Sequence, residues 1–296
     1  MGGSLKTRIL YATNGSRPAR DTGSLLRRLA DPERVEVTVN VCDSVEFTFP
    51  EPPWRYGEER KPRAQPPEVA EREVSHFRAD GFEVDSHLGS GVPATQIIQM
   101  VESGEYSVAA MGAGSTKWLD SLLLGSTSTR VLHSSQASVL LVHRLENLTD
   151  SLRVLLATDG SDDAAEAIET FMGIAEPGKV AVKVVAVAET IPKVHRMVPE
   201  SLPSSRSAEH LQEAARDNAE RAAGPLRDGG FKVAIECPTG DPVREILQLS
   251  AGADLVVCGS RGLGGASRLF LGSVSDQLAR LAPATLVCRS HGREVE

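Results

Sequence analysis

One stretch of the chain combines residue types that bind phosphate. It has the spacing Gly-x2-Gly-x9-Gly-Ser, formed by Gly259, Gly262, Gly272 and Ser273. Glycines let backbone N–H groups approach an anion closely, and the unpaired N–H groups at the start of a helix attract phosphate. Arg261 and Arg268 lie in the same stretch and add guanidinium groups that can reach phosphate oxygens. The stretch therefore predicts a site for a phosphorylated ligand.

Other interpretations of these glycines are open. Read as a dinucleotide-binding fingerprint, the run from Gly262 lacks the third glycine and follows the wrong strand, and no GxxxxGK[ST] motif exists in the chain. A glycine-rich turn without a ligand is the structural alternative, and the stretch alone favours it. Residues 153–161 favour a ligand site over a ligand-free turn, because they read RVLLATDGS and place Asp159 directly after an apolar, strand-like run.

The chain repeats itself in order and in spacing. Residues 8–16 match 153–161 at an offset of 145, and residues 107–112 match 254–259 at an offset of 147. Gly125-Ser126 matches Gly272-Ser273, also at 147. The period is too long for a solenoid unit, so it predicts two domains, 1–147 and 148–296. The join at 145–151 is short and polar, which predicts that the halves pack against each other.

Within each half, short apolar runs alternate with segments of helical spacing, which predicts a parallel sheet covered by helices on both faces. In the second half we expect strands at 153–158, 180–188, 231–237, 254–258 and 285–288. The expected helices are 162–175, 207–228, 242–249 and 272–281, the third opened by Asp241 as N-cap. Gly224-Pro225 should break or bend the second helix. The expected strands of the first half are 9–12, 35–41, 82–86, 108–111 and 139–142.

Asp159, the complete glycine spacing and the sequence Gly240-Asp241-Pro242 make the second half resemble the nucleotide-binding universal stress proteins. The resemblance extends, less completely, to the first half. It implies an α/β fold of two tandem flavodoxin-like (adenine-nucleotide alpha-hydrolase-like) domains. Each would be a five-stranded parallel sheet of order 3-2-1-4-5 with helices on both faces. Such an order leaves a crevice at the carboxyl ends of strands 1 and 4.

By the same resemblance, the crevice of the second half takes ATP, accompanied by Mg²⁺. Asp159 then contacts the ribose or metal-linked groups, and the main chain of Val187 meets the adenine edge. Gly259 and Gly262, with Arg261 beside them, line the ribose and phosphates, and Gly272 with Ser273 holds the phosphates. No protein side chain is assigned as a metal ligand, and no residue is assigned as catalytic.

The first half departs from this pattern at two positions. Asn14 replaces the aspartate and loses its charge, and Ser115 replaces the second glycine. The remaining equivalents are Val41 at the adenine position, Gly112, Gly125 and Ser126. We expect a weaker site there, and whether it binds nucleotide stays open.

Three functions compete on these features. The first is a regulatory ATP-binding stress-response protein in which the nucleotide sets conformation or the choice of partner. The second is a slow ATPase, although the sequence offers no convincing general base or arginine finger beyond Arg261 and Arg268. The third is an interaction scaffold that binds no nucleotide.

Composition limits the partners. The net charge of −8 and the 4% aromatic content argue against nucleic acid, and no apolar run approaches the ~20 residues that span a bilayer. Four cysteines without a CxxC pair, and no signal-peptide pattern, indicate reduced thiols in a cytoplasmic protein. The fifth strands, 138–142 and 285–288, should pair the halves as an intramolecular pseudo-dimer, and a further homodimer is possible.

Overall fold

The protein is described here by a computed structural model of residues 6–43, 65–114, 124–146, 148–149, 151–189, 204–262 and 271–290. Two residues of the predicted sites, Ser115 and Arg268, lie outside these ranges. Both halves of the repeat are described through all of their strands and helices named below.

Both halves follow the alternating plan that the sequence predicts. The first half contains β1 (Thr7–Ala12), α1 (Arg17–Leu29), β2 (Val35–Asp43), α2 (Pro66–Ala79), β3 (Glu83–Ser90), α3 (Pro93–Glu102), β4 (Val108–Gly112), α4 (Ser126–Ser134) and β5 (Ser138–Val142). The second contains β6 (Leu152–Ala157), α5 (Asp162–Ile174), a 3-10 turn (Pro177–Lys179), β7 (Val180–Val185), β8 (Ala188–Glu189), α6 (Ser204–Asp228), β9 (Lys232–Glu236), β10 (Thr239–Gly240), α7 (Pro242–Ser250), β11 (Leu255–Gly259), α8 (Ser273–Leu281) and β12 (Ala284–Cys288).

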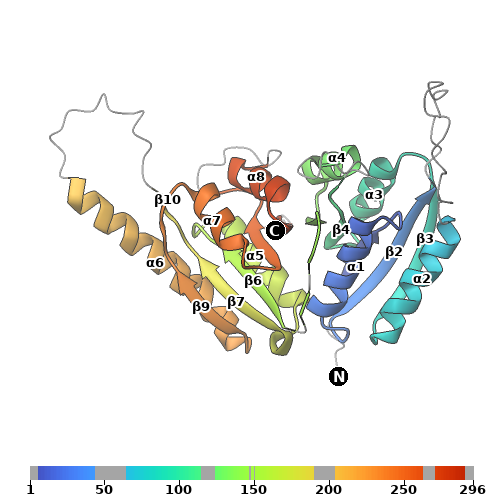
Figure 1. Cartoon of the computed structure of the whole chain (residues 1–296), viewed down its shortest axis with the longest axis horizontal. Coiled ribbons are helices and arrows are strands. Elements are labelled where there is room, and N and C mark those ends of the chain that lie inside the picture. The colour runs from blue at the N-terminus through green and yellow to red at the C-terminus, as the bar shows by residue number, and fades with distance from the viewer. Residues whose placement is uncertain are drawn as a thin grey trace, which may run out of the picture.

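Ten strands form one sheet in the order β3-β2-β1-β4-β5-β12-β11-β6-β7-β9. Each half therefore has the predicted order 3-2-1-4-5, and its strands are parallel throughout. Helices α1, α2, α5 and α6 cover one face around one apolar core, and α3, α4, α7 and α8 cover the other around a second core (Figure 1). The flavodoxin-like architecture expected from the sequence is confirmed.

The halves join symmetrically. β5 and β12 pair antiparallel, with Leu140 opposite Leu286, so the predicted contact between the fifth strands is present. On the helical side, the N–H of Asp31 donates to the carbonyl of Ile174 at 2.9 Å, and that of Glu176 donates to the carbonyl of Leu29 at 2.9 Å. Each bond maps onto the other under the 145-residue offset, which identifies a pseudo-two-fold relation between the halves.

The second half differs from expectation at two places. α6 is not broken at Gly224-Pro225 but continues through Pro225, whose missing N–H removes one helical hydrogen bond close to the end of the helix. The preceding residue, Gly224, has no Cβ that could clash with the proline ring, so it can keep its helical conformation before Pro225. The strand expected at 180–188 is divided, because β7 ends at Val185 and β8 leaves the large sheet to pair with β10.

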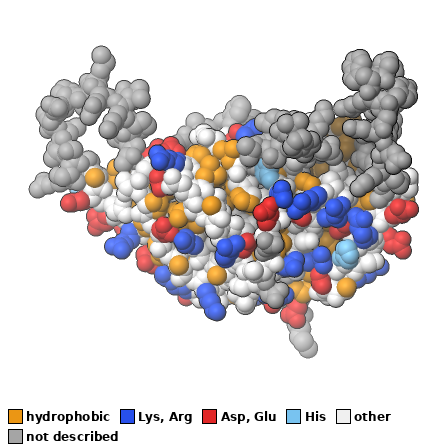
Figure 2. All heavy atoms as spheres, viewed as in Figure 1, with side chains coloured by type: hydrophobic (Ala, Val, Ile, Leu, Met, Phe, Trp, Pro, Cys, Tyr) orange, Lys and Arg blue, Asp and Glu red, His pale blue; other side chains and the backbone are white. Residues whose placement is uncertain are grey.

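Neither sign of charge dominates the face that carries α1 and α6. Figure 2 shows basic and acidic side chains interspersed over it. Arginines of α1 have acidic neighbours. Nη1 of Arg27 lies 2.8 Å from Oδ2 of Asp80, and Nε of Arg17 lies 3.9 Å from Oδ2 of Asp21. Among the helices in the ranges given above, none is both long enough and apolar enough to cross a bilayer.

Candidate functional site

The predicted site residues of the second half meet at the carboxyl ends of β6 and β11. Asp159 follows β6, and Gly262 follows β11 after two intervening residues. A Cβ added to Gly262 would lie 2.5 Å from Oδ2 of Asp159. The carboxylate therefore lies directly against Gly262, and two segments that are distant in sequence meet where the strand order reverses.

A fixed turn orients Asp159. Gly160 adopts φ +81°, a conformation that favours glycine, and its N–H donates to Oγ1 of Thr158 at 3.1 Å. Oδ1 of Asp159 accepts the N–H of Ser161 at 3.0 Å, and its carbonyl accepts Nδ2 of Asn218 from α6 at 2.8 Å. These hydrogen bonds hold the turn that carries Asp159 beside Gly262.

The far end of the loop presents the start of α8. Gly272 is the N-cap, and Ser273 is the first helical residue and is exposed. The N–H of Gly272 donates to the carbonyl of Ser260 at 2.8 Å, and Oγ of Ser275 lies 2.7 Å from the same carbonyl. These bonds hold the start of α8 against the segment that follows β11, and the exposed first residue leaves the positive end of the helix able to attract an anion.

Gly259 has a packing role that the sequence did not reveal. A Cβ at this position would lie 2.7 Å from the carbonyl carbon of Asp163 and 2.9 Å from the backbone nitrogen of Ala164. Gly112 in the first half makes the same approach, 2.7 Å from the backbone nitrogen of Ala19. Both glycines let the end of a strand contact the first turn of a helix, independently of any ligand.

Arg261 is held by an internal ion pair. Its Nε and one terminal nitrogen donate to the two carboxylate oxygens of Asp163 at 3.0 and 2.9 Å. Oδ2 of Asp163 also accepts the hydroxyl of Ser260 at 2.7 Å, and Oδ1 accepts that of Ser290 at 3.2 Å. These contacts tie the glycine loop to α5 and to the segment after β12, while the phosphate role predicted for Arg261 stays a prediction.

The environment of Asp163 favours its charged form. Burial alone raises the pKa of this carboxyl, but the hydrogen bonds from Arg261 and Ser260 outweigh burial and hold the pKa below its ordinary value of 3.8. The side chain of Asp163 is 8% exposed. Sequence reasoning missed it, because an aspartate in a first helical turn is ordinary and nothing in the sequence pairs it with Arg261.

The two residues predicted for the adenine edge differ in setting. Val187 lies between β7 and β8, half-buried against the core beneath α7 and α8. Val41 lies inside β2, buried and paired with Leu88 of β3. Strand register places Ile9 beside Val37 and Val154 beside Val182, so the counterpart of Val187 is Cys42. The sequence match of Val41 to Val187 is therefore shifted by one residue.

The first half keeps the frame of the site. Asn14 is exposed and accepts the N–H of Ser16 at 3.0 Å, and Gly15 adopts φ +72°, as the corresponding residues of the second half do. Gly125 caps α4, and the exposed Ser126 is the first residue of that helix. The ion pair has no counterpart here, because Pro18 and Gly114 occupy the positions of Asp163 and Arg261.

Cysteine and metal chemistry receive no support from the described residues. All four cysteines are free thiols, and burial raises the pKa of Cys258 to about 12, which disfavours the reactive thiolate. No group of three or more His, Cys, Asp or Glu side chains is placed to hold a metal ion within the described ranges.

Fold and site together define a tandem pair of flavodoxin-like domains that share one sheet. The model of the Universal stress protein family matches residues 6–143 and 151–289. The chain belongs to this family and carries two of its domains.

Known relatives agree with that assignment. A universal stress protein of Mycolicibacterium smegmatis is 33% identical over 64% of this chain and 61% of its own length. Universal stress protein Rv2005c of Mycobacterium tuberculosis is 27% identical over 79% of this chain and 77% of its own. The crystal structure of a universal stress protein from Archaeoglobus fulgidus covers 95% of this chain and 98% of its own, with a TM-score of 0.61 and 21% identity.

Proposed function

We propose that this protein is a regulatory ATP-binding stress protein whose principal nucleotide site lies in the second half. The observation that carries the proposal is that the Asp159 carboxylate lies directly against Gly262, in the segment between β11 and the exposed first residue of α8. A carboxylate beside a glycine-lined surface and a helix N-terminus suits a ligand with a polar sugar and an anionic tail.

The residues present fit ATP with Mg²⁺. The missing side chain of Gly262 lets the carboxylate of Asp159 lie directly against the backbone of the loop, where a group bound by this backbone would also meet the carboxylate. Mg²⁺ prefers oxygen ligands and is commonly held by substrate phosphates with one or two carboxylates. Asp159 is the carboxylate that would complete this set, and Gly272 and Ser273 would hold the phosphates. When bound, the cation would neutralise part of the phosphate charge.

Binding is favoured over hydrolysis as the main role. An ATPase needs a group that positions water or stabilises the charge that develops on the transferred phosphoryl. Arg261, the candidate for that task, already has two donors committed to Asp163. The same ion pair links the loop to α5 and to Ser290, which gives nucleotide occupancy a physical route to the rest of the molecule.

A glycine substitution tests the proposal. Gly262→Ala places a methyl group against Oδ2 of Asp159 and displaces the carboxylate, without forcing any backbone contact. We expect at least about tenfold weaker binding of MgATP in calorimetry, with little change in thermal stability. Gly252→Ala is the matched control, because its Cβ meets only the Leu249 carbonyl at 3.8 Å. Equal affinity of wild type and Gly262→Ala would refute the assignment.

A further inference from the structure

One peptide of the turn after β6 is held from both sides. This peptide joins Asp159 to Gly160, and its N–H donates to Oγ1 of Thr158 at 3.1 Å. Its carbonyl oxygen accepts Nδ2 of Asn218, in the middle of α6, at 2.8 Å. A Cβ at Gly160 would lie 2.5 Å from Oδ1 of Asn218, so the carboxamide packs directly on the glycine. A residue 59 positions further along the chain therefore contacts the predicted ligand-binding turn.

The carboxamide of Asn218 is itself oriented by an arginine. A terminal nitrogen of Arg221, one turn further along α6, donates to Oδ1 of Asn218. Because a guanidinium can only donate, the oxygen of the carboxamide faces Arg221 and its NH₂ group faces the carbonyl of Asp159. A carboxamide offers both functions at once, whereas an aspartate lacks the donor and a valine lacks both. The contact with the turn therefore requires the residue type that is present.

Gly160 alone does not fix the conformation of this turn. It adopts φ +81°, and glycine occupies positive and negative φ about equally readily. Rotation of the peptide between Asp159 and Gly160 would turn its carbonyl oxygen away from α6 and change φ of the glycine. The hydrogen bond from Asn218 opposes this rotation. It thereby stabilises the backbone conformation in which the carboxylate of Asp159 lies against Gly262.

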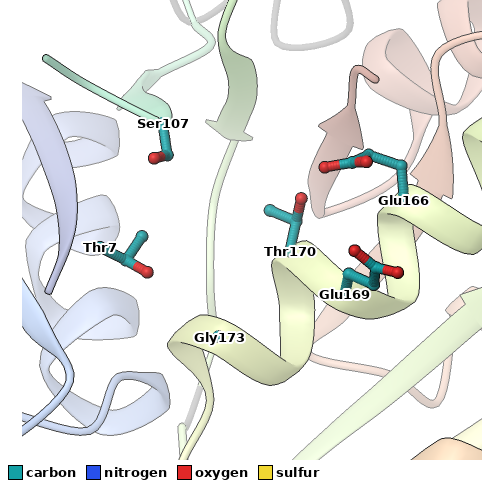
Figure 3. Close-up of a pocket in the computed structure, with 6 residues that line it drawn as sticks. All are labelled: Thr7, Ser107, Glu166, Glu169, Thr170 and Gly173. Carbon is teal, nitrogen blue, oxygen red and sulfur yellow. The ribbon is translucent and has the colours of Figure 1, made fainter. Parts of the chain in front are cut away.

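Helix α5 forms a fixed frame behind the turn. Asp163, in its first turn, accepts hydrogen bonds from Arg261 and Ser290. Further along, α5 faces the first half across a pocket of about 250 Å³ (Figure 3), which is lined by Glu166, Glu169, Thr170 and Gly173 of α5 and by Thr7 and Ser107 of the first half. These contacts fix the helix beyond the turn, and the peptide before it is held by Thr158 and α6.

The position of Asn218 is occupied by valine in the first half. Phe82 and Phe231 mark equivalent corners, because each donates its N–H to the carbonyl five residues earlier, at 3.1 and 3.0 Å. Their offset of 149 residues pairs Asn218 with Val69. A Cβ at Gly15 would lie 3.1 Å from Cγ2 of Val69, as one at Gly160 would lie against Asn218. The first half therefore keeps the packing at this position and lacks the donor.

An arginine of α1 holds the turn of the first half instead. A terminal nitrogen of Arg20 donates to the carbonyl oxygen of Gly15, which adopts φ +72°. Thr13 accepts the N–H of Gly15 at 3.2 Å, so the hydroxyl contact is common to both halves. Under the offset of 145, the residue that corresponds to Arg20 is the exposed Ala165. The first half thus holds its turn from α1, and the second half holds its turn from α6.

We propose that Asn218 is a positioning residue for the nucleotide site of the second half, an inference that rests on the function proposed above. Its carboxamide holds the peptide after Asp159 so that the carboxylate meets the ligand in a fixed orientation. A contact that is ordered before binding loses less conformational freedom when the ligand arrives, which raises affinity. α6 therefore contributes to the site through Asp159.

Asn218→Val tests this role, because it installs the side chain found at the same place in the first half. Valine and asparagine have similar helix propensities, so the variant should fold. Calorimetry should show at least about threefold weaker binding of MgATP, the loss expected for one hydrogen bond. Ala208→Val is the matched control, because it adds the same side chain at an exposed position of α6 and should leave the affinity unchanged.

Ala165→Arg supplies the rescue. In the Asn218→Val chain, an arginine at this position takes the place of Arg20 and can donate to the carbonyl of Gly160, so the affinity for MgATP should be restored. In the wild-type chain the same substitution should change the affinity less than about twofold, because the turn is already held. Equal gains in both chains would show an effect of charge alone. That result, or no gain in either chain, would overturn the proposal.

The failure of this inference differs from that of the proposed function. A lower melting temperature of Asn218→Val with unchanged affinity for MgATP would show that the contact serves folding alone, and it would overturn the positioning role only. No binding of MgATP by the wild-type chain would refute the function and the inference with it. If Asn218→Val does not fold, Asn218→Asp replaces it, since it keeps the shape and loses the donor. Unchanged affinity in that variant would overturn the proposal.

Discussion

Asp163 connects three segments of the second half through one carboxylate. It accepts two hydrogen bonds from Arg261, one from Ser260 and one from Ser290, and its side chain is almost fully buried. A buried charge of this kind is costly when its partner is removed, because the remaining charge has lost its counter-charge. The residue therefore supports the glycine loop without belonging to the predicted ligand contacts.

Asp163→Asn should lower the free energy of unfolding by about 3 kcal/mol at neutral pH, the low end for breaking a buried pair. The pKa of Asp163 is lowered in the folded state, so its stabilisation is complete above about pH 4 and is lost as the pH falls below that. Urea unfolding at pH 7 and pH 3 should therefore show a smaller gap between wild type and variant at pH 3.

The control for this prediction is Asp276→Asn. Asp276 also accepts two hydrogen bonds from an arginine, Arg280, but the two side chains are 27% and 35% exposed. An exposed pair contributes less than about 1 kcal/mol, so this variant should be nearly as stable as wild type. Equal losses in the two variants would show that burial of Asp163 does not strengthen its contacts.

At the scale of elements, a glycine allows the close contact between the end of a strand and the start of a helix in each half. β11 contacts the start of α5 at Gly259, and β4 contacts the start of α1 at Gly112. The sequence predicted both glycines as parts of nucleotide sites, and their steric role became visible only with the helix beside them. A side chain at either position collides with backbone atoms, which cannot turn aside as a side chain can.

Gly259→Ala should destabilise the protein by about 1–3 kcal/mol, the usual cost of overpacking. Thermal or urea unfolding measures this, with Gly178→Ala as the control, because nothing lies within 4 Å of a Cβ at Gly178. If Gly259→Ala were as stable as wild type, the first turn of α5 could shift without cost, which would contradict its close packing against Gly259.

Much of the element order could be predicted from periodicity, and the failures have their cause in contacts between residues distant in sequence. Apolar runs and the repeat sufficed for the large sheet, because buried parallel strands are continuously apolar. The division of β7 from β8 depends on pairing with β10, which no local pattern shows. Likewise, the pairing of Arg261 with Asp163 depends on a tertiary contact between residues distant in sequence, and the register shift at Val41 depends on strand pairing.

At the scale of the whole molecule, the sheet continues through the join between the halves. One apolar core includes Leu25 and Phe77 of the first half together with Phe171 and Leu286 of the second. A shared core and a shared sheet couple the stability of the two domains, because neither can unfold without exposing apolar surface of the other.

We therefore expect one cooperative transition in differential scanning calorimetry. Leu286→Ala should remove about 2–5 kcal/mol and lower that single transition as a whole, since Leu286 is 1% exposed at the join. Two separated transitions in wild type, or a variant in which only part of the heat absorption moves, would contradict the coupling between the halves.

Titration calorimetry with MgATP decides whether the second half holds the principal nucleotide site. Wild type should show a tight site that Asp159→Asn weakens by about 1–3 kcal/mol, the loss of a charged hydrogen bond. Asn14→Ala, the control in the first half, should leave that site unchanged. A dominant site that survives Asp159→Asn and disappears in Asn14→Ala would contradict the account.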